Sequence, residues 1–371
     1  MLFQKRGTLV LPFSKNGRGD GVGQAEGDEV GRSILAPVRE AAGGNGVRSG
    51  VVECLETSSR GGCSTRRQAR RLRHAEADVR RLHVFDHGGR GQPILREADA
   101  PFAQVRADPK RRFTSRGQIV PAFEAARQEI AGKLPQLFDV WPRAEFQIRA
   151  LPESSKHSQG NGYYAPAGAD GSRPGVLWIN TYAPGVSDTF NVMTIMLHEG
   201  LPGHHFQTSI AQEQAQLPAF RRFDFTNAYG EGWALYSESL GNELGLFDDP
   251  WNHYGHLNYA ILRANRLVID TGLHAMGWDV DTGVRWMLEH SSMTRDQAAA
   301  EVERYVAYPG QALSYKLGEL KIRELRQRAE QELGSKFDIK AFHDQILLGG
   351  SMPLTILEQN VDRWISATRP R

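Results

Sequence analysis

Residues 188–207, DTFNVMTIMLHEGLPGHHFQ, combine an apolar run with a group of histidines. The first ten residues are largely apolar, and Asp188 or Thr189 can cap a helix at their start. We therefore predict a buried helix over 188–197 that carries His198 and Glu199 at its C-terminal end. A histidine and a glutamate at the end of a buried helix favour metal chemistry.

The spacing of the histidines differs from the common zinc motif His-Glu-x-x-His, in which two imidazoles four residues apart share one helix face. Here Pro202 stands four residues after His198. On a straight helix His204 would point to another side, and His205 would lie about 10 Å further along the axis. Zinc–nitrogen bonds are only about 2 Å long. Because Pro202 and Gly203 can break a helix, we expect a kink or bulge that folds the second histidine back.

A second acidic motif, EGWALYSE, follows at residues 231–238. Its two glutamates are seven residues apart, on one face of a helix. In a two-histidine site a carboxylate from a later helix commonly supplies the third zinc ligand. Glu199 cannot easily be both ligand and base, so we assign it the role of general base towards the attacking water. The alternative is that the histidines are structural and the glutamates form solvated ion pairs.

The sequence pattern of residues 106–371 as a whole predicts one folded domain. Residues 146–149 alternate like a strand, and 163–164 and 176–180 flank a turn and predict a hairpin. After Thr189 the pattern is helical, with breaks at glycine and proline. The expected class is mainly α (α+β), with a small antiparallel hairpin or sheet. A helix is predicted over 118–138, with Ile119, Phe123, Ala126, Ile130 and Leu134 on its apolar face.

Four segments carry a resemblance to a known family: HEGLPGHHFQ, YGEGWALYSESLGNELG, YPGQALSYKLG and FHDQILLGGSMPL. In this order they resemble the bacterial family called domain of unknown function 885, over about residues 106–365. That family is regarded as a divergent group of zincin-like metallopeptidases. The resemblance implies a zincin-like helical domain with a deep cleft and a short strand that binds extended peptide.

The resemblance also implies a ligand set. The family is more distantly similar to helical zinc carboxypeptidases and angiotensin-converting enzymes, whose motif is His-Glu-x-Gly-His. Gly203-His204 matches its Gly-His, which favours His204 over His205 as the second ligand. Glu231 matches the downstream glutamate ligand. His205 and Glu238 become alternative ligands or hydrogen-bond partners of a ligand.

Several further residues are candidates for the reaction or for substrate binding. Tyr308 and Tyr315 are each able to donate a hydrogen bond to an oxyanion, as a Tyr or His does in related zincins; an ordinary structural role is the alternative. Asn180 ends the hairpin that, by the resemblance, pairs with peptide. A polar stripe at helical spacing either forms intrahelical ion pairs or binds a substrate carboxylate: Arg263, Arg266, Asp270 and His274.

Residues 1–105 are rich in glycine and arginine and have little periodicity. Such a composition cannot offset the entropy cost of ordering, so we predict a low-complexity region that is disordered or foreign to the fold. The alternative is a basic arm over Thr65–Arg81 for nucleic acid or a partner. Family members usually carry a helical N-terminal half, so residues 106–371 correspond to the C-terminal half.

The composition excludes several classes of protein. The net charge of +2 gives no case for nucleic acid or membrane binding by the whole chain. The two cysteines, Cys54 and Cys63, lie far from the histidines in sequence, so we expect no thiolate ligand. No apolar run reaches the roughly 18 residues of a transmembrane helix, and no clear signal peptide is present, so we expect a cytoplasmic protein.

The expected function is hydrolysis of a peptide or small amide substrate with Zn²⁺ as cofactor. A di-iron oxygenase is disfavoured because it needs Glu-x-x-His repeats, and none of the three glutamates has a histidine three residues later. A serine hydrolase is disfavoured because the chain has no Gly-x-Ser-x-Gly. The remaining alternative is a truncated, inactive relative that acts as a binding or scaffold protein.

Overall fold

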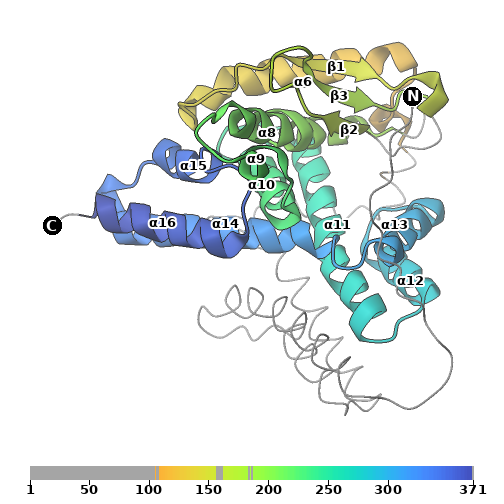
Figure 1. Ribbon diagram of the computed structural model, residues 1–371. Coiled ribbons are helices and arrows are strands. Elements are labelled where there is room, and N and C mark those ends of the chain that lie inside the picture. The colour runs from red at the N-terminus through yellow and green to blue at the C-terminus, as the bar shows by residue number, and fades with distance from the viewer. Residues whose placement is uncertain (1–104, 106–107, 156–161, 183, 185–186, 370–371) are drawn as a thin grey trace, which may run out of the picture.

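The computed structural model describes residue 105 and residues 108–155, 162–182, 184 and 187–369. The described chain is mainly helical with one small sheet, so the predicted fold class is confirmed (Figure 1). The longer helices are α6 (Ile119–Lys133), α8 (His204–Glu213), α10 (Asn227–Ser239), α11 (Pro250–Ala275), α12 (Val280–His290), α13 (Arg295–Ala307), α14 (Leu313–Leu333), α15 (Ile339–Leu347) and α16 (Leu354–Thr368).

Helix α10 is the most deeply buried element, with every residue from Tyr229 to Ser239 inside the protein. A helix that is buried all round must be enclosed by neighbours, and α14 packs closely along it. The two backbones meet at Gly232 and Gly318, where a Cβ on Gly318 would lie 1.9 Å from the Ala228 carbonyl oxygen. Only glycine permits this approach, which brings the N-terminal turns of α10 and α14 together.

The sheet contains β1 (Phe146–Ala150), β2 (Gly162–Ala165) and β3 (Gly175–Ile179) in the order β1-β3-β2. β2 and β3 are antiparallel, as the predicted hairpin requires, whereas β1 runs parallel to β3. The sheet is therefore mixed, with β2 at one edge. It lies beside α6 at the top of Figure 1, and α6 buries the five apolar residues predicted for its inner face, the last of them in the turn that follows.

The helical breaks fall where glycine and proline predict them. Asp249 caps α11, its side chain accepting from the main-chain N–H groups of Trp251 and Asn252, and Pro250 is the first helical residue. Gly310 and Gly350 have φ angles of 79° and 66° in the connections before α14 and α16. The remaining short elements are η1 (Pro109–Arg111), η2 (Arg116–Gln118), η3 (Leu134–Gln136), η4 (Glu153–Ser155), η6 (Thr189–Asn191), α7 (Val192–Ile195), η7 (Met196–Gly200), α9 (Ala219–Phe223) and η8 (Gly334–Lys336).

The two largest apolar cores hold most of these elements. The larger joins the sheet to α6, α7, α8, α10, α14, α15 and α16, and includes Trp233 and Phe206. The smaller joins α11, α12 and α13 around Ile269 and Met287. Within the described residues, no helix has the length and apolar character needed to cross a bilayer. The N-terminal turns of α8, α10 and α14 converge beside the larger core, and the candidate site is built there.

Candidate metal centre

The predicted helix over 188–197 is present, but it changes along its length from a 3₁₀ helix to an α-helix and then to a π-helix. A 3₁₀ turn, η6, leads into α7, which is followed by the π-helical turn η7. In η7 the N–H of Leu201 donates to the carbonyl of Met196, five residues earlier, at 3.1 Å. π-turns within helices occur frequently at functional sites. Here the wide turn carries His198 and Glu199.

The predicted break at Pro202-Gly203 separates two helices. Leu201 is extended, its bond to Pro202 is cis, and α8 begins anew at His204. A Cβ on Gly203 would lie 1.8 Å from the carbonyl oxygen of His198, so no side chain fits at this position. The close contact between the end of η7 and the start of α8 places the two histidines side by side.

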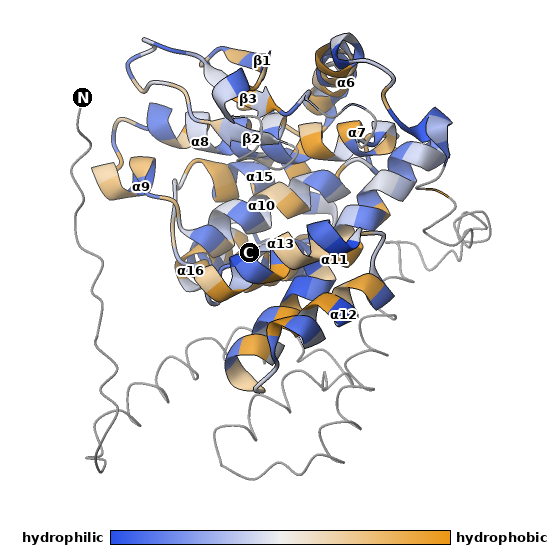
Figure 2. Ribbon diagram, turned by 90° about the vertical axis from the view of Figure 1, so that its right-hand side faces the viewer, coloured by the Kyte–Doolittle hydropathy of each residue, from blue (hydrophilic) through white to orange (hydrophobic). Residues whose placement is uncertain are grey.

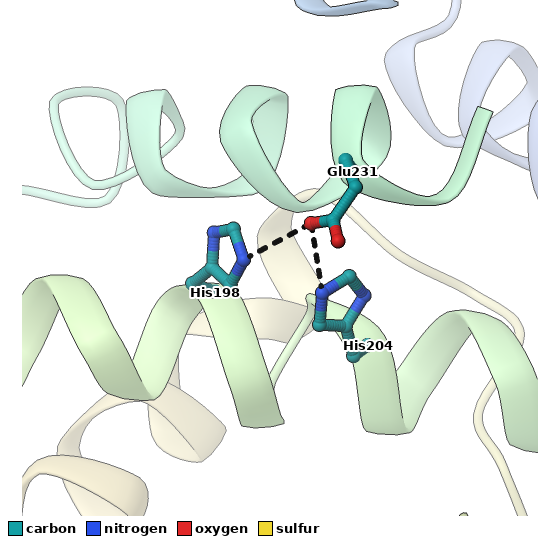
Figure 3. A group of neighbouring side chains, drawn as sticks. All are labelled: His198, His204 and Glu231. Atoms are coloured by element: carbon teal, nitrogen blue, oxygen red, sulfur yellow. Dashed lines mark ion pairs between the residues drawn. The ribbon is translucent and has the colours of Figure 1, made fainter. Parts of the chain in front are cut away.

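Three buried side chains from three elements converge, as Figure 3 shows: His198 of η7, His204 of α8 and Glu231 of α10. Oε2 of Glu231 lies 3.5 Å from Nε2 of His198 and 3.3 Å from Nε2 of His204. Bonds of about 2.0–2.1 Å to one tetrahedral zinc ion would separate neighbouring ligand atoms by about 3.3 Å. Both nitrogen–oxygen distances therefore match those between ligands of one ion, and all three atoms lie within 4.8 Å of one another.

The hydrogen-bond pattern supports the same interpretation. Oε2 of Glu231 is buried and has no hydrogen-bond partner among the described residues. Buried polar atoms are rarely left unpaired, so an atom of this kind needs a specific explanation. A cation between the three side chains supplies one. The indole N–H of Trp233 donates to the carbonyl of Pro202 at 2.8 Å and holds α10 against the segment between η7 and α8.

The other nitrogen of His198 is held by a second carboxylate. Nδ1 of His198 donates to Oε1 of Glu238 at 2.7 Å, and Nη2 of Arg263 lies 3.6 Å from the same oxygen. Burial would raise the pKa of Glu238, but Arg263 and His198 outweigh it and hold the pKa below its usual range. Such a partner fixes the tautomer and ring orientation of a ligating histidine.

The negative charge around His198 favours a cation. Burial lowers the pKa of His198, but Glu231, Glu238 and Glu199 together raise it to about 10. Burial likewise opposes ionisation of Glu231, yet the two histidines hold the pKa of that carboxyl well below its ordinary value. A site that stabilises positive charge this strongly is electrostatically suited to a divalent metal.

Glu199 is half-buried and lies at the edge of the sheet. Its Oε2 accepts a hydrogen bond from the main-chain N–H of Tyr164 in β2 at 3.1 Å. Because β2 is an edge strand, this N–H is not used by the sheet. The sequence suggested Tyr164 only as part of a strand. No local pattern links it to Glu199, thirty-five residues away.

His205 lies apart from this group. Its ring stacks on Phe146 at 4.5 Å, and its Nδ1 accepts from the hydroxyl of Tyr164 at 3.0 Å. Burial lowers the pKa of His205 to about 4, so its ring is neutral at physiological pH. Among the described residues, the structure brings His204 to His198, and it packs His205 against the sheet.

The two candidate tyrosines occupy different environments. The ring of Tyr315 is buried and lies 6.4 Å from the ring of His198, nearly parallel to it. Its hydroxyl accepts from Nη2 of Arg304 at 3.0 Å and from the amide of Gln311 at 3.3 Å. Tyr308 is 65% exposed at the end of α13 and lines a shallow depression of about 520 Å³ that also includes Asn227 and Gln311. Tyr315 is therefore the tyrosine beside the cluster.

The polar stripe on α11 connects to other helices. Nη2 of Arg266 donates to Glu301 of α13 at 3.0 and 3.2 Å. Burial raises the pKa of Asp270 to about 6, and this carboxylate accepts from the N–H of Gly310 at 3.1 Å. Nε2 of His274 bonds to the carbonyl of Tyr305 at 3.0 Å. The stripe thus fixes α11 against α13 and the start of α14.

Two other predicted substrate-binding residues have structural partners. The guanidinium of Arg263 lies 4.4 Å from the ring of Tyr259 and 5.7 Å from that of Tyr315. Asn180 follows β3, and its Oδ1 accepts from the N–H of Tyr182 at 3.0 Å, which closes a turn.

A mainly helical fold that brings two histidines and a glutamate together from three helical segments defines a protein with a candidate divalent-metal centre. The chain belongs to the bacterial family of unknown function called DUF885, whose model matches residues 66–361. The predicted resemblance to this family is confirmed. The division at residue 105 stays a prediction, because residues 1–104 lie outside the described part of the chain.

The solved structures similar to the chain include two lipoproteins so described. A "putative lipoprotein" from Colwellia psychrerythraea is 31% identical with a TM-score of 0.75, over 85% of this chain and 55% of that one. The chain thus spans about half the length of that protein. A "putative lipoprotein of unknown function" from Shewanella oneidensis is 17% identical with a TM-score of 0.57, over 83% and 69%, and shows the fold alone. None of the curated proteins matches the chain.

Proposed function

We propose that the protein is a zinc-dependent hydrolase of peptide or other amide bonds. The observation that carries the proposal is the convergence of His198, His204 and Glu231 at distances of 3.3 and 3.5 Å between histidine nitrogens and one carboxylate oxygen. Zinc held by two histidines and a glutamate keeps a position open, activates water for attack and polarises a carbonyl group. The residues around the cluster have the chemistry that such a reaction needs.

Glu199 is the candidate general base. It follows the ligand His198 directly, and its carboxylate is held by the N–H of Tyr164 on the edge strand. A positioned carboxylate accepts the proton of the attacking water and can return it to the leaving amine. Glu238 holds His198 in the tautomer whose Nε2 faces the cluster.

Tyr315 is the stronger candidate for stabilising the oxyanion, with Tyr308 as the second. The hydroxyl of Tyr315 accepts two hydrogen bonds, from Arg304 and Gln311, and retains its own proton to donate. Tyr308 is exposed, and would reach a substrate only from the depression beside Asn227. Arg263, Arg266, His274 and Asn180 remain proposed substrate-binding residues.

Metal content and hydrolysis test the proposal together. We expect about one zinc per chain in the purified protein and cleavage of fluorogenic peptide amides, both lost in His198→Ala and His204→Ala. His205→Ala is the matched control because His205 is a buried neighbour that faces the sheet, so it should keep its zinc. A wild-type protein without stoichiometric zinc, or loss of zinc only in His205→Ala, would contradict the proposal.

A binding or scaffold protein that keeps this fold without the reaction is the second candidate. It is favoured by the coverage of only 55% of the similar Colwellia protein, because the rest of that protein has no counterpart in the aligned chain. Stoichiometric zinc without hydrolysis of any amide in a broad peptide library would support this candidate over the enzyme.

The cellular location of the protein is a separate question. The expected cytoplasmic location contrasts with the two similar structures, both called lipoproteins. We propose on their account that the protein acts outside the cytoplasm. Fractionation of cells that express the full-length gene would decide, since recovery in the cytoplasmic fraction alone contradicts this placement.

A further inference from the structure

The connection between α8 and α10 exposes a strip of aromatic residues. Eight large hydrophobic side chains are exposed in the described part of the chain, and three of them lie within six residues: Phe220 at 62%, Phe223 at 51% and Phe225 at 46%. Figure 2 shows the hydrophobic colour of α9 at the margin of the molecule. Exposed apolar side chains that gather in one place commonly mark a binding site.

Helix α9 is oriented with its charged side chains inward, the reverse of a typical surface helix. Nε of Arg221 donates to the carbonyl of Gly349, and Nε of Arg222 donates to that of Gln212, each at 3.0 Å. Both arginines are partly buried, while Phe220 and Phe223 face outward. Burial of a phenylalanine side chain is favourable, so this arrangement forgoes stability that the opposite orientation would give.

Phe225 extends the strip to the metal centre. Its ring meets the ring of His204 edge-on, with centroids 5.7 Å apart. On its other side the ring packs on the backbone of α10, where a Cβ on Gly230 would lie 2.3 Å from two of its carbons. Phe225 is therefore fixed between a candidate ligand and the residue before Glu231, yet almost half of it remains exposed.

A depression in the surface lies at the N-terminal end of α10. Asn227, two residues after Phe225, lines the depression of about 520 Å³ together with Tyr308 and Ser314. Asn227 is also one helical turn before Glu231, on the same face of α10. The depression therefore begins at the turn of α10 that precedes Glu231, while Phe225 and the three cluster residues are not among the residues that line it.

We propose that Phe225 forms an apolar subsite, and that the protein selects substrates with an aromatic or large aliphatic side chain beside the bond that is cleaved. This inference rests on the proposed hydrolase function and adds the substrate class. Because Phe225 contacts His204, a group bound at this subsite lies within one side chain's length of the carbonyl that reacts at the proposed metal. The ring is uncharged, and apolar surface of this kind discriminates against charged side chains at the same position.

The test compares two metal-chelating probes, L-phenylalanine hydroxamate and L-alanine hydroxamate, on the zinc-loaded full chain by calorimetry. We expect the phenylalanine probe to bind at least about tenfold more tightly, as an apolar pocket contact typically gives. In Phe225→Ala the ratio of the two affinities should fall to about one. Phe225→Leu should keep part of the preference, and kcat/KM for matched phenylalanyl and alanyl amides should follow the same order.

Phe220→Ala is the matched control, since it removes a more exposed phenylalanine that has no ring contact with His204. An equal loss in this variant, or an undiminished preference in Phe225→Ala, overturns the subsite. If wild type binds both probes equally, the subsite fails while the hydrolase proposal stands. If neither probe binds and no zinc is retained, both fail together.

Discussion

Buried histidines pack against two faces of helix α10: His343 on one, and His198 and His204 on the other. The hydrogen-bond partners of their ring nitrogens differ. At His343 both ring nitrogens are satisfied: Nδ1 donates to the carbonyl of Leu137, and Nε2 accepts from the hydroxyl of Tyr236, each at 2.9 Å. The ring also stacks on Phe138 at 4.5 Å. At the candidate metal centre, by contrast, the nitrogens of His198 and His204 converge on one carboxylate oxygen of Glu231 that has no hydrogen-bond partner among the described residues.

The comparison shows what distinguishes a structural histidine from a candidate ligand. Burial is the same, since His343 and His198 are both enclosed. The difference lies in the surrounding charge: burial lowers the pKa of His343 to about 3, whereas the carboxylates around His198 raise its pKa to about 10 against the effect of burial. Converging ligand atoms and an excess of carboxylates thus indicate the metal centre more reliably than buried histidines do.

The largest expected effect is that of Glu231→Gln. An amide is a poor zinc ligand, so the variant should lose stoichiometric zinc, a greater loss than the roughly 10–100-fold typical of hydrogen-bond partners of ligands. Elemental analysis of the purified variant measures it. Glu243→Gln is the control, because Glu243 pairs with Arg326 near the surface. Full zinc retention in Glu231→Gln would contradict the proposal that the surroundings of His198 and His204 bind metal whereas those of His343 do not.

His343→Ala should give the reverse result. Removing a fully buried ring leaves a cavity and takes away the acceptor of the Tyr236 hydroxyl and the donor to the Leu137 carbonyl, so stability should fall by about 3 kcal/mol or more. Urea denaturation measures the loss. The zinc content of the folded variant should remain that of wild type, and a protein that loses its metal here would show that both sites belong to one functional unit.

Glu238→Gln probes the partner of His198. Without the carboxylate, Nδ1 of His198 keeps only a weaker acceptor, and zinc affinity should fall about 10–100-fold. Competition with a chromogenic chelator would measure this change. Unchanged affinity would mean that the 2.7 Å hydrogen bond from His198 to Glu238 does not tune the centre.

The last prediction concerns the dependence of stability on pH. His343 is neutral in the folded protein down to about pH 3, whereas an unfolded histidine takes up a proton near pH 6.5. The unfolded chain therefore binds more protons in this window, and the contribution of His343 to stability falls by up to about 1.4 kcal/mol per unit as the pH drops. His343→Gln should show a shallower acid slope in urea titrations between these values, and identical slopes would contradict the assignment.

Much of the fold follows from local pattern. Periodic apolar residues predict α6 correctly, and glycine and proline mark the ends of α11 and α13 because these residues restrict or free the backbone itself. The parallel pairing of β1 with β3 was not predicted, since pairing direction depends on how distant segments pack. The hairpin of β2 and β3 was predicted because its strands and turn are contiguous.

The residues of the candidate site could be predicted from the sequence, but their arrangement in space could not. His198, His204 and Glu231 came from motifs, yet the π-turn that carries His198 is selected by packing against α10 and has no local signature. Phe225 was missed, although the run AFRRFDF before the acidic motif offered a signal: three aromatics in a short polar connection. An apolar residue in such a connection is easily taken for an ordinary loop residue.

The break between η7 and α8 makes this centre difficult to transplant. A pair of histidines four apart can be installed on almost any exposed helix, because the helix alone sets their separation. Here the candidate ligands come from three separate helical segments, and Gly203 admits no side chain against His198. A designer who wished to graft the centre onto another scaffold would have to copy the junction and the close packing of α10 with it, not a short motif.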